Sequence, residues 1–350
     1  MGANFRSDNV TGVDPAILQA IADANQGPAN AYGGDDCTKG LAAKFADVFE
    51  TEVTVLPVAL GTAANALCLS AVTPPWGAIY AHEKAHVIMD ECNAPELYSG
   101  GARLIGLPGQ HGKFSVDTLA TTLKQALRGV HHAKPSAVSL TQLTESGTAY
   151  SVDEVKAIGA LCRKEGLALH MDGSRLGNAI AGLNCTPAEI TWKAGVDLLS
   201  FGATKNGAMA AEAIVLFRKD AGLAEALEYR RKRAGHLFSK MRFLSVQLEA
   251  YLAGGRWLKN ARHANGEAQR LSQGLAAVPG VELLSPVQGN EIFVRMPVPL
   301  VEAIEAEGYL LQPWENPEGS RQVIRLVTAF NTDPKAVDGL LAAAAKRRAA

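Results

Sequence analysis

The alternation of apolar and polar positions divides the chain into two parts. From about Val53 to Phe217, short apolar runs alternate with longer stretches of helical periodicity. Short apolar runs separated by helical segments are typical of buried strands joined by helices, so this part predicts an α/β sheet covered by helices. The expected strands are residues 54–57, 78–81, 102–107, 137–141, 167–171, 197–202 and 213–217.

The rest of the chain predicts a second, smaller unit. Residues 222–254 have a strongly helical pattern that includes a group of basic side chains. Helical and strand patterns then alternate at residues 261–278, 292–296, 300–307 and 323–328. We therefore expect three parts: an N-terminal arm over residues 1–30, a large α/β domain with a mostly parallel sheet over 31–250, and a small α+β domain over 251–350.

One helix start and one uncharged stretch refine this picture. Ser151, followed three residues later by Glu154, forms a capping-box pattern that predicts a helix over residues 152–165. No charged residue occurs between Glu52 and Glu83, a span long enough to cross a bilayer. Proline and glycine interrupt this span and its first part is β-branched, so a buried strand, a turn and a helix explain it better than a membrane span.

Composition narrows the possible partners. The 350 residues include 34 Lys and Arg against 35 Asp and Glu, so the formal net charge is -1. This balance creates no global field that would recruit nucleic acid or an anionic membrane, and we expect a small-molecule ligand. The 5 cysteines form no C-x-x-C pair, which favours reduced thiols over a zinc or redox site. Because no secretory signal pattern is visible either, we expect a cytoplasmic protein.

The segment around Asp172 is the first candidate for chemistry. An apolar strand pattern ends at Asp172, and Arg175 follows three residues later. In open α/β sheets, side chains just past the carboxyl ends of strands face the ligand crevice, so Asp172 is expected there. The alternative interpretation of Asp172 is the N-cap of the following helix.

Two further segments contain candidate residues. Residues 198–207 lead from another apolar strand into small and polar residues around one lysine, Lys205, although an isolated lysine can also be a simple surface residue. Gly61 and Thr62 follow a strand and open an apolar helix, where free backbone N–H groups and a hydroxyl can bind a phosphate. The alternative there is a tight turn with Thr62 as the N-cap.

Together, these three segments match the needs of pyridoxal 5′-phosphate (PLP). The phosphate site, the strand-end aspartate and the strand-end lysine occur in this order within one predicted α/β domain. PLP needs an anchor for its phosphate, a carboxylate that keeps its pyridine nitrogen protonated, and a lysine that holds its aldehyde as an imine. The sequence therefore predicts PLP as the cofactor.

The same segments and their flanks resemble the L-threonine aldolases, a group of the fold-type-I, aspartate-aminotransferase-like PLP enzymes. The likeness covers nearly the whole chain and includes residues 5–11 (Phe-Arg-Ser-Asp-Asn-Val-Thr), 32–36 (Tyr-Gly-Gly-Asp-Asp) and 324–328 (Ile-Arg-Leu-Val-Thr). The resemblance implies retro-aldol cleavage of an L-β-hydroxy-α-amino acid, such as threonine, allo-threonine or phenylserine, to glycine and an aldehyde.

The resemblance also implies a role for each matched residue near the cofactor. Lys205 matches the imine lysine, and Asp172 matches the partner of the pyridine nitrogen. Gly61 and Thr62 match the phosphate site. His86 matches the histidine that stacks on the cofactor ring.

Further matches concern the substrate and the assembly. Ser7, Arg175 and Arg325 match positions that hold the substrate's α-carboxylate, a task suited to arginine's planar donors, and Arg175 also counts among the cofactor-binding residues. Arg242 matches an arginine that reaches the phosphate from a neighbouring subunit, although it could also be one more charge on a basic helix. The resemblance thus implies a homo-oligomer, a dimer of dimers, with active sites at subunit interfaces.

Two questions stay open at this point. Where many members of the group have a histidine near the substrate's β-hydroxyl, Glu145 falls at or beside that place, so the base for the hydroxyl is not identified. A β-eliminating lyase or an aminotransferase of the same fold is the nearest alternative function. A non-catalytic PLP-fold protein and a cofactor-free Rossmann-type binder are more distant alternatives.

Overall fold

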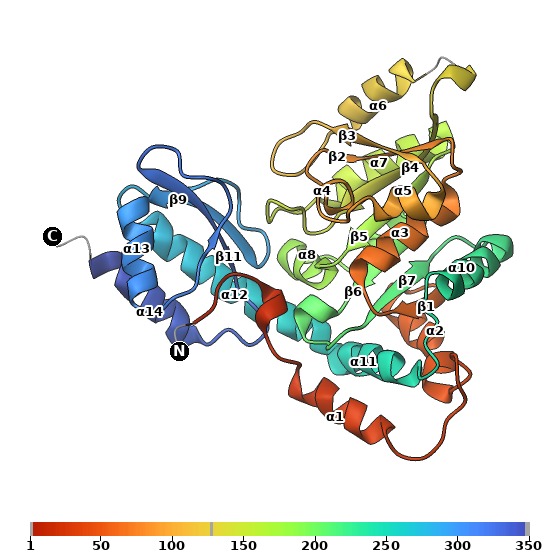
Figure 1. Ribbon diagram of the computed structural model, residues 1–350, viewed down its shortest axis with the longest axis horizontal. Helices are drawn as coiled ribbons and strands as arrows, with labels where there is room; N and C mark the ends of the chain where they lie inside the picture. The colour runs from red at the N-terminus through yellow and green to blue at the C-terminus, as the bar shows by residue number, and fades with distance from the viewer. Residues whose placement is uncertain (1–2, 127–128, 347–350) are drawn as a thin grey trace.

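The large sheet is the centre of the molecule. The computed structural model describes residues 3–126 and 129–346, so residues 1–2 of the expected arm, residues 127–128, and residues 347–350 of the expected C-terminal domain lie outside the described part. Seven strands form the large sheet in the spatial order β1-β7-β6-β5-β4-β2-β3 (Figure 1). They are β1 (Thr54–Val58), β2 (Gly77–His82), β3 (Arg103–Leu107), β4 (Lys134–Thr141), β5 (Ala168–Gly173), β6 (Leu198–Gly202) and β7 (Glu212–Leu216).

The direction of the strands confirms the predicted fold class. The pairs β2–β3, β2–β4, β4–β5 and β5–β6 are parallel. Strand β7 instead pairs antiparallel with both β1 and β6. The sheet is therefore mostly parallel, as the alternation of strand and helix patterns predicts.

Helices cover both faces of this sheet, which explains the continuous apolar runs of its strands. Strands β2, β5, β6 and β7 are buried along their whole length. One face packs against Phe45, Ile158 and Leu248, and the other against Leu67 and Leu227. These side chains come from α2 (Asp36–Phe49), α7 (Val152–Glu165), α11 (Arg242–Leu252), α3 (Gly61–Val72) and α10 (Ala221–Arg233).

The local predictions agree closely with these elements. All seven predicted strands are present, and their ends differ from the predicted ones by at most three residues. Helix α7 has its predicted bounds, and Ser151 and Glu154 form the capping box. The uncharged stretch folds into β1, α3 and β2. Among the described residues, no helix has both the length and the apolar character needed to span a membrane.

A second, antiparallel sheet lies beside the first one. Its strands, in the order β10-β11-β9-β8, pack against helices from the C-terminal part (Figure 1, blue). The elements of this unit are β8 (Glu282–Leu283), β9 (Glu291–Pro297), β10 (Gln312–Pro313), β11 (Arg321–Val327), α12 (Arg256–Ala276), α13 (Val298–Ala306) and α14 (Pro334–Ala345).

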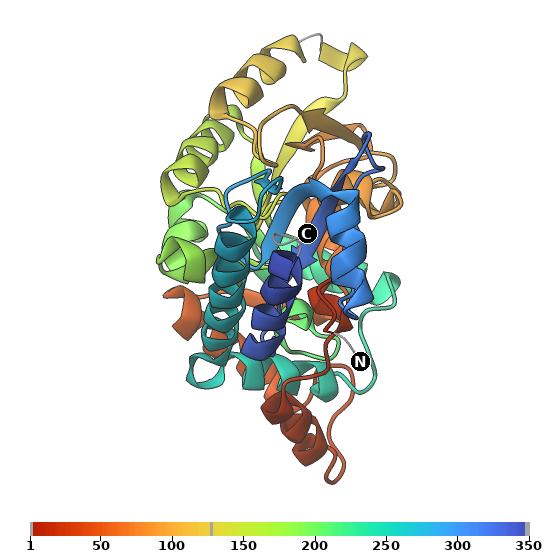
Figure 2. The ribbon, with the colours of Figure 1, turned by 90° about the vertical axis from the view of Figure 1, so that its left-hand side faces the viewer.

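The N-terminal segment lies against this second sheet, although almost the whole sequence separates them (Figure 2). Phe5 is buried in the core of the second sheet. Its N–H donates to the carbonyl of Leu310 (2.9 Å), and its own carbonyl accepts from the N–H of Val327 (2.8 Å). The first residues therefore help to form the wall of the cleft described below. The domain limits at residues 30 and 250 stay a prediction.

Candidate active site

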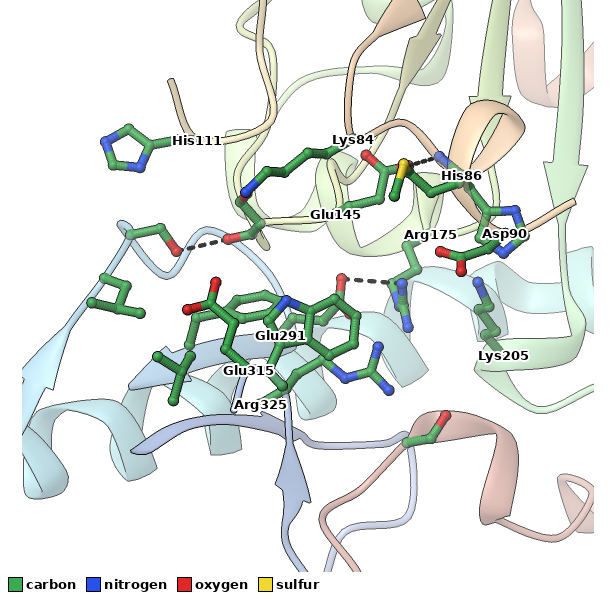
Figure 3. A pocket seen from close by; sticks show the side chains of 18 of the residues that line it. Lys84, His86, Asp90, His111, Glu145, Arg175, Lys205, Glu291, Glu315 and Arg325 are labelled. Carbon is green, nitrogen blue, oxygen red and sulfur yellow. Dashed lines mark hydrogen bonds and ion pairs between the residues drawn. The ribbon is translucent and has the colours of Figure 1, made fainter. Parts of the chain in front are cut away.

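A cleft of about 710 Å³ lies between the large sheet and the second sheet. Six of the ten predicted site residues line this cleft, and Figure 3 shows five of them labelled around the same space. The six are Ser7, His86, Glu145, Arg175, Lys205 and Arg325. The residues outside the lining are Gly61, Thr62, Asp172 and Arg242.

The parallel strands of the large sheet explain why distant residues meet here. The carboxyl ends of parallel strands lie at the same edge of a sheet, and the residues that follow them face one crevice. Strands β2, β4, β5 and β6 are each followed by one of the lining residues, namely His86, Glu145, Arg175 and Lys205.

Lys205 lies in a short 3-10 helix, η4 (Thr204–Asn206), just after β6. A Cβ atom on Gly202, the last residue of β6, would lie only 2.5 Å from the carbonyl oxygen of Ser174. Glycine therefore allows the turn before Lys205 to approach the end of β5. Within the described part of the chain, the Lys205 amine has no hydrogen-bond or ion-pair partner, so it is available to a carbonyl compound in the cleft.

The carboxylate of Asp172 is buried beneath the cleft and is held in its charged form. Its Oδ2 accepts a hydrogen bond from Asn65 Nδ2 (2.8 Å), and its Oδ1 accepts from the N–H and the hydroxyl of Ser174 (2.9 and 2.6 Å). Burial raises the pKa of Asp172, but the Ser174 hydrogen bonds and the charges of Lys205 and His86 outweigh it, so the pKa lies below its ordinary value.

The two capping alternatives from the sequence are wrong. Helix α8 (Leu176–Leu183) has Arg175 at its N-cap position, so Asp172 does not cap it. Helix α3 begins at Gly61 with Leu60 as the N-cap, and Leu60 has no side-chain acceptor for the first N–H groups. Thr62 is therefore inside the first turn, and this turn offers N–H donors and the positive end of the helix dipole to an anion.

His86 is fixed by a buried carboxylate that the sequence analysis did not identify. Its Nδ1 lies 2.9 Å from Glu91 Oε1, which also accepts a hydrogen bond from Asn65 Nδ2 (2.7 Å). The hydrogen bond to Glu91 raises the pKa of His86, and burial raises the pKa of Glu91. Because Asn65 also binds Asp172, one chain of contacts joins Asp172 to His86. No local motif marks Glu91 or Asn65, since these contacts depend on how α3 packs.

Glu145 combines a raised pKa with a free hydrogen-bonding atom. Its Oε1 accepts the backbone N–H of His86 (2.7 Å), whereas its Oε2 is buried and has no hydrogen-bond partner within the described chain. Burial raises the pKa of Glu145 to about 7. A carboxyl group with such a pKa can take up or release a proton near neutral pH.

Arg175 is already paired with two carboxylates. Its Nε and Nη2 donate to Asp8 (2.8 and 3.0 Å), and its Nη1 lies 3.0 Å from Glu291 Oε2. Burial raises the pKa of Asp8, but the adjacent Arg175 guanidinium outweighs this effect and lowers the pKa below its ordinary value. Asp8 and Glu291 were not identified from the sequence, because they come from the arm and from β9.

Arg325, on β11, has no carboxylate partner among the described residues. Its Nη2 donates to the carbonyl of Arg6 (3.1 Å), and its guanidinium lies 4.5 Å from the centre of the Trp314 ring. Its Nε is buried without a hydrogen-bond partner in the described structure, and burial lowers its pKa. Ser7 lines the same cleft, and its Oγ accepts the N–H of Asn9.

Arg242 lies outside the cleft of its own chain. It is the first residue of α11, and its Nη1 donates to the carbonyl of Gly27 (3.0 Å). A role of Arg242 in a neighbouring active site therefore stays a prediction.

These features define the class of protein. A mostly parallel sheet with a lysine and a buried aspartate at neighbouring strand ends is the arrangement of fold-type-I PLP enzymes. The residues present also fit this cofactor, because an amine without a partner among the described residues, an anionic buried carboxylate and a helix start without a side-chain cap lie at the same edge of the sheet.

The chain belongs to the beta-eliminating lyase family, whose sequence model matches residues 4–298. It is 45% identical over 319 residues to the low specificity L-threonine aldolase of Pseudomonas sp. (strain NCIMB 10558), which covers 91% of each chain. It is 44% identical over 318 residues to the low specificity L-threonine aldolase of Pseudomonas aeruginosa, again over 91% of each chain.

Solved structures support the same family assignment. The threonine aldolase of Leishmania major matches with a TM-score of 0.91 and 27% identity, covering 99% of this chain and 100% of the other. An aspartate aminotransferase of Thermus thermophilus matches with a TM-score of 0.71 and 14% identity, over 98% of this chain and 96% of that chain. This second likeness concerns the fold alone.

Proposed function

We propose that this protein is a PLP-dependent lyase that cleaves L-threonine, L-allo-threonine or related L-β-hydroxy-α-amino acids, such as phenylserine, to glycine and an aldehyde. The observation that carries the proposal is the placement of Lys205 and Asp172 at neighbouring strand ends, opposite Arg325, an arginine without a carboxylate partner among the described residues. The names of the two Pseudomonas relatives support the choice of substrate.

The residues around the cleft have distinct tasks in holding the cofactor. Lys205 would supply the amine that binds it covalently, His86 would contact its ring, and Asp172 would keep its ring nitrogen protonated. The first turn of α3, at Gly61 and Thr62, would bind its phosphate. When bound, PLP supplies an electron sink for the electron pair of a broken Cα bond.

Other residues bind and activate the substrate. Ser7, Arg175 and Arg325 hold the α-carboxylate, and ion pairs to Asp8 and Glu291 hold Arg175 in place. Correct orientation by this carboxylate contact determines which Cα bond can break. Glu145 takes the proton from the β-hydroxyl, because its Oε2 has no hydrogen-bond partner among the described residues and its pKa is about 7.

The assignment of Lys205 can be tested directly. The purified protein with PLP should have a visible absorption band that borohydride bleaches, and Lys205→Ala should lose both the band and nearly all turnover. Lys219→Ala, which changes an exposed lysine, is the matched control and should behave like the wild type. Wild-type turnover in Lys205→Ala would refute the assignment.

The role of Glu145 predicts a pH dependence. Burial raises its pKa to about 7, so the form that can accept a proton predominates above that pH. The rate of aldehyde release should therefore rise as the pH increases through about 7. Glu145→Gln should lose this rise and slow the reaction by about 100-fold or more. An unchanged rate and pH profile in this variant would refute the assignment of Glu145 as the base.

The assembly is part of the proposal. We infer a homo-oligomer, a dimer of dimers, in which Arg242 of one subunit reaches the phosphate site of another. Exposed apolar side chains support an interface between subunits, because Tyr32, Leu60 and Met209 are 53%, 56% and 50% exposed in a single chain. The composition and the cysteine pattern favour the cytoplasm as its location.

Arg242→Ala tests this arrangement. Loss of a charge-assisted contact to the phosphate should weaken PLP binding by about 10- to 150-fold. Arg233→Ala, on the exposed face of α10, is the control. An unchanged PLP titration in Arg242→Ala would mean that Arg242 is a solvated surface charge with no role in PLP binding.

A further inference from the structure

A second buried carboxylate, on Glu212, lies directly behind the turn that bears Lys205. Glu212 is the first residue of β7 and pairs with Gly202 at the end of β6. It is buried, and no Lys or Arg within the described chain forms an ion pair with it. A buried carboxylate without a cation is costly unless hydrogen-bond donors surround it. The donors around Glu212 therefore indicate what it does.

These donors come from the two residues that precede Lys205. Glu212 Oε2 accepts the backbone N–H of Ala203 (3.0 Å). The side chain and the backbone N–H of Thr204 also act on the Glu212 carboxylate and lower its pKa. The Thr204 hydroxyl oxygen accepts a hydrogen bond from the N–H of Ala211 (3.2 Å). The hydroxyl proton of Thr204 is therefore directed away from Ala211. Glu212 therefore holds the start of the η4 turn through the Ala203 N–H and acts on the neighbouring Thr204.

The other side of the turn is held by neutral groups. Asn206 Nδ2 donates to the Tyr251 hydroxyl (2.7 Å) and to the Trp257 carbonyl (2.8 Å). The Asn206 carbonyl accepts from Asn260 Nδ2 (3.1 Å). Lys205 is thus placed between two anchored residues while its own amine has no partner among the described side chains. Of the two anchors, the one at Glu212 is ionisable.

We propose that Glu212 is a positioning residue for Lys205, which fixes the η4 turn and thereby sets the direction of the lysine amine in the cleft. This inference rests on the proposed role of Lys205 as the lysine that binds PLP. It does not depend on which bond of the substrate breaks.

The ionisation of Glu212 makes this positioning depend on pH. Burial raises the pKa of Glu212 to about 7, although its hydrogen bonds and the charge of Lys205 act in the opposite direction. The titratable groups that face it are Lys205 on η4 and Tyr251 on α11. Above about pH 7 the carboxylate is a strong acceptor for the turn. Below that pH it takes up a proton, and the turn is held less firmly.

The test uses hydrogen–deuterium exchange of residues 203–206 in the full-length protein, with and without PLP. Glu212→Leu removes the acceptor, so these amides should exchange about tenfold faster or more. Glu212→Gln keeps one acceptor oxygen, so its amides should exchange at an intermediate rate that no longer changes near pH 7. In the wild-type protein, the protection of these amides from exchange should weaken below that pH. Glu225→Gln, on the exposed side of α10, is the matched control.

A second measurement follows the Lys205 amine itself. The pH titration of the visible band of the PLP-loaded protein should shift in Glu212→Gln and stay unchanged in Glu225→Gln. If Glu212→Leu does not fold, Glu212→Gln decides the question through its exchange and its titration. Wild-type exchange and a wild-type titration in Glu212→Gln would overturn the proposal. A protein that releases ammonia in place of glycine would refute the aldolase function and leave this result intact.

Discussion

Two arginines border the same cleft, and they differ in what holds them. Arg175 is 11% exposed and forms ion pairs with Asp8 and Glu291. Arg325 contacts a backbone carbonyl and the Trp314 ring, and its Nε has no partner in the described structure. An arginine whose charge is already balanced gains less from a new anion than one whose charge is not. We therefore expect Arg325 to gain more than Arg175 from binding an anion in the cleft.

This difference refines the roles that the family resemblance implies. The resemblance assigns both arginines to the substrate carboxylate. The structure adds a connecting role for Arg175, because it joins the end of β5 to the arm at Asp8 and to β9 at Glu291, while its contact with the carboxylate stays a prediction. Arg325 has the unsatisfied donor, so we expect it to contribute most of the binding energy for the carboxylate.

The largest effect is expected when Arg175 is replaced, and it concerns the free energy of unfolding. Arg175→Met would leave Asp8 and Glu291 buried without their cation, at 2% exposure each. Removal of one partner of a buried ion pair costs about 3–5 kcal/mol, and denaturant unfolding should show a loss of this size. Arg163→Met, at an exposed position of α7, should leave the unfolding free energy unchanged.

A compensating variant sharpens this prediction. Arg175→Met combined with Asp8→Asn and Glu291→Gln removes the stranded charges, so it should recover most of the lost stability. If Arg175→Met alone were as stable as the wild type, the connecting role of Arg175 would be wrong.

The next effect concerns catalysis at Arg325. Arg325→Ala should lower kcat/KM by about 10- to 150-fold, the equivalent of one charge-assisted contact. Its unfolding free energy should change little, since the arginine has no carboxylate partner among the described residues. Steady-state kinetics and a denaturant titration on the same preparation would check both parts. A stability loss as large as that of Arg175→Met would remove the distinction between the two arginines.

The smallest effect is expected at Trp314, which positions Arg325 through its ring. Trp314→Ala removes a cation–π contact of about 0.5–1 kcal/mol, so kcat/KM should fall only about two- to fivefold. Trp314→Phe retains an aromatic face and should lie between this variant and the wild type. An effect as large as that of Arg325→Ala would mean that the ring itself binds the substrate.

The parts of this site that could be predicted are those that depend on local sequence. Each strand pattern places its own final residues at one edge of the sheet, which is why Lys205, Asp172 and Arg175 could be identified. Asp8 could not, because it meets Arg175 across 167 residues of sequence. Glu91 and Glu212 were missed for another reason, since an isolated glutamate has no pattern that distinguishes a buried acceptor from a solvated charge.

The most direct test of the central claim is a product analysis with the purified, PLP-loaded protein and L-threonine or L-allo-threonine. The account predicts that glycine and acetaldehyde are released in equal amounts, and that Lys205→Ala releases neither. D-Threonine should not react, because the opposite configuration at Cα would turn its carboxylate away from Arg325. Release of 2-oxobutanoate and ammonia in place of glycine would contradict the aldolase assignment and favour an eliminating lyase of the same family.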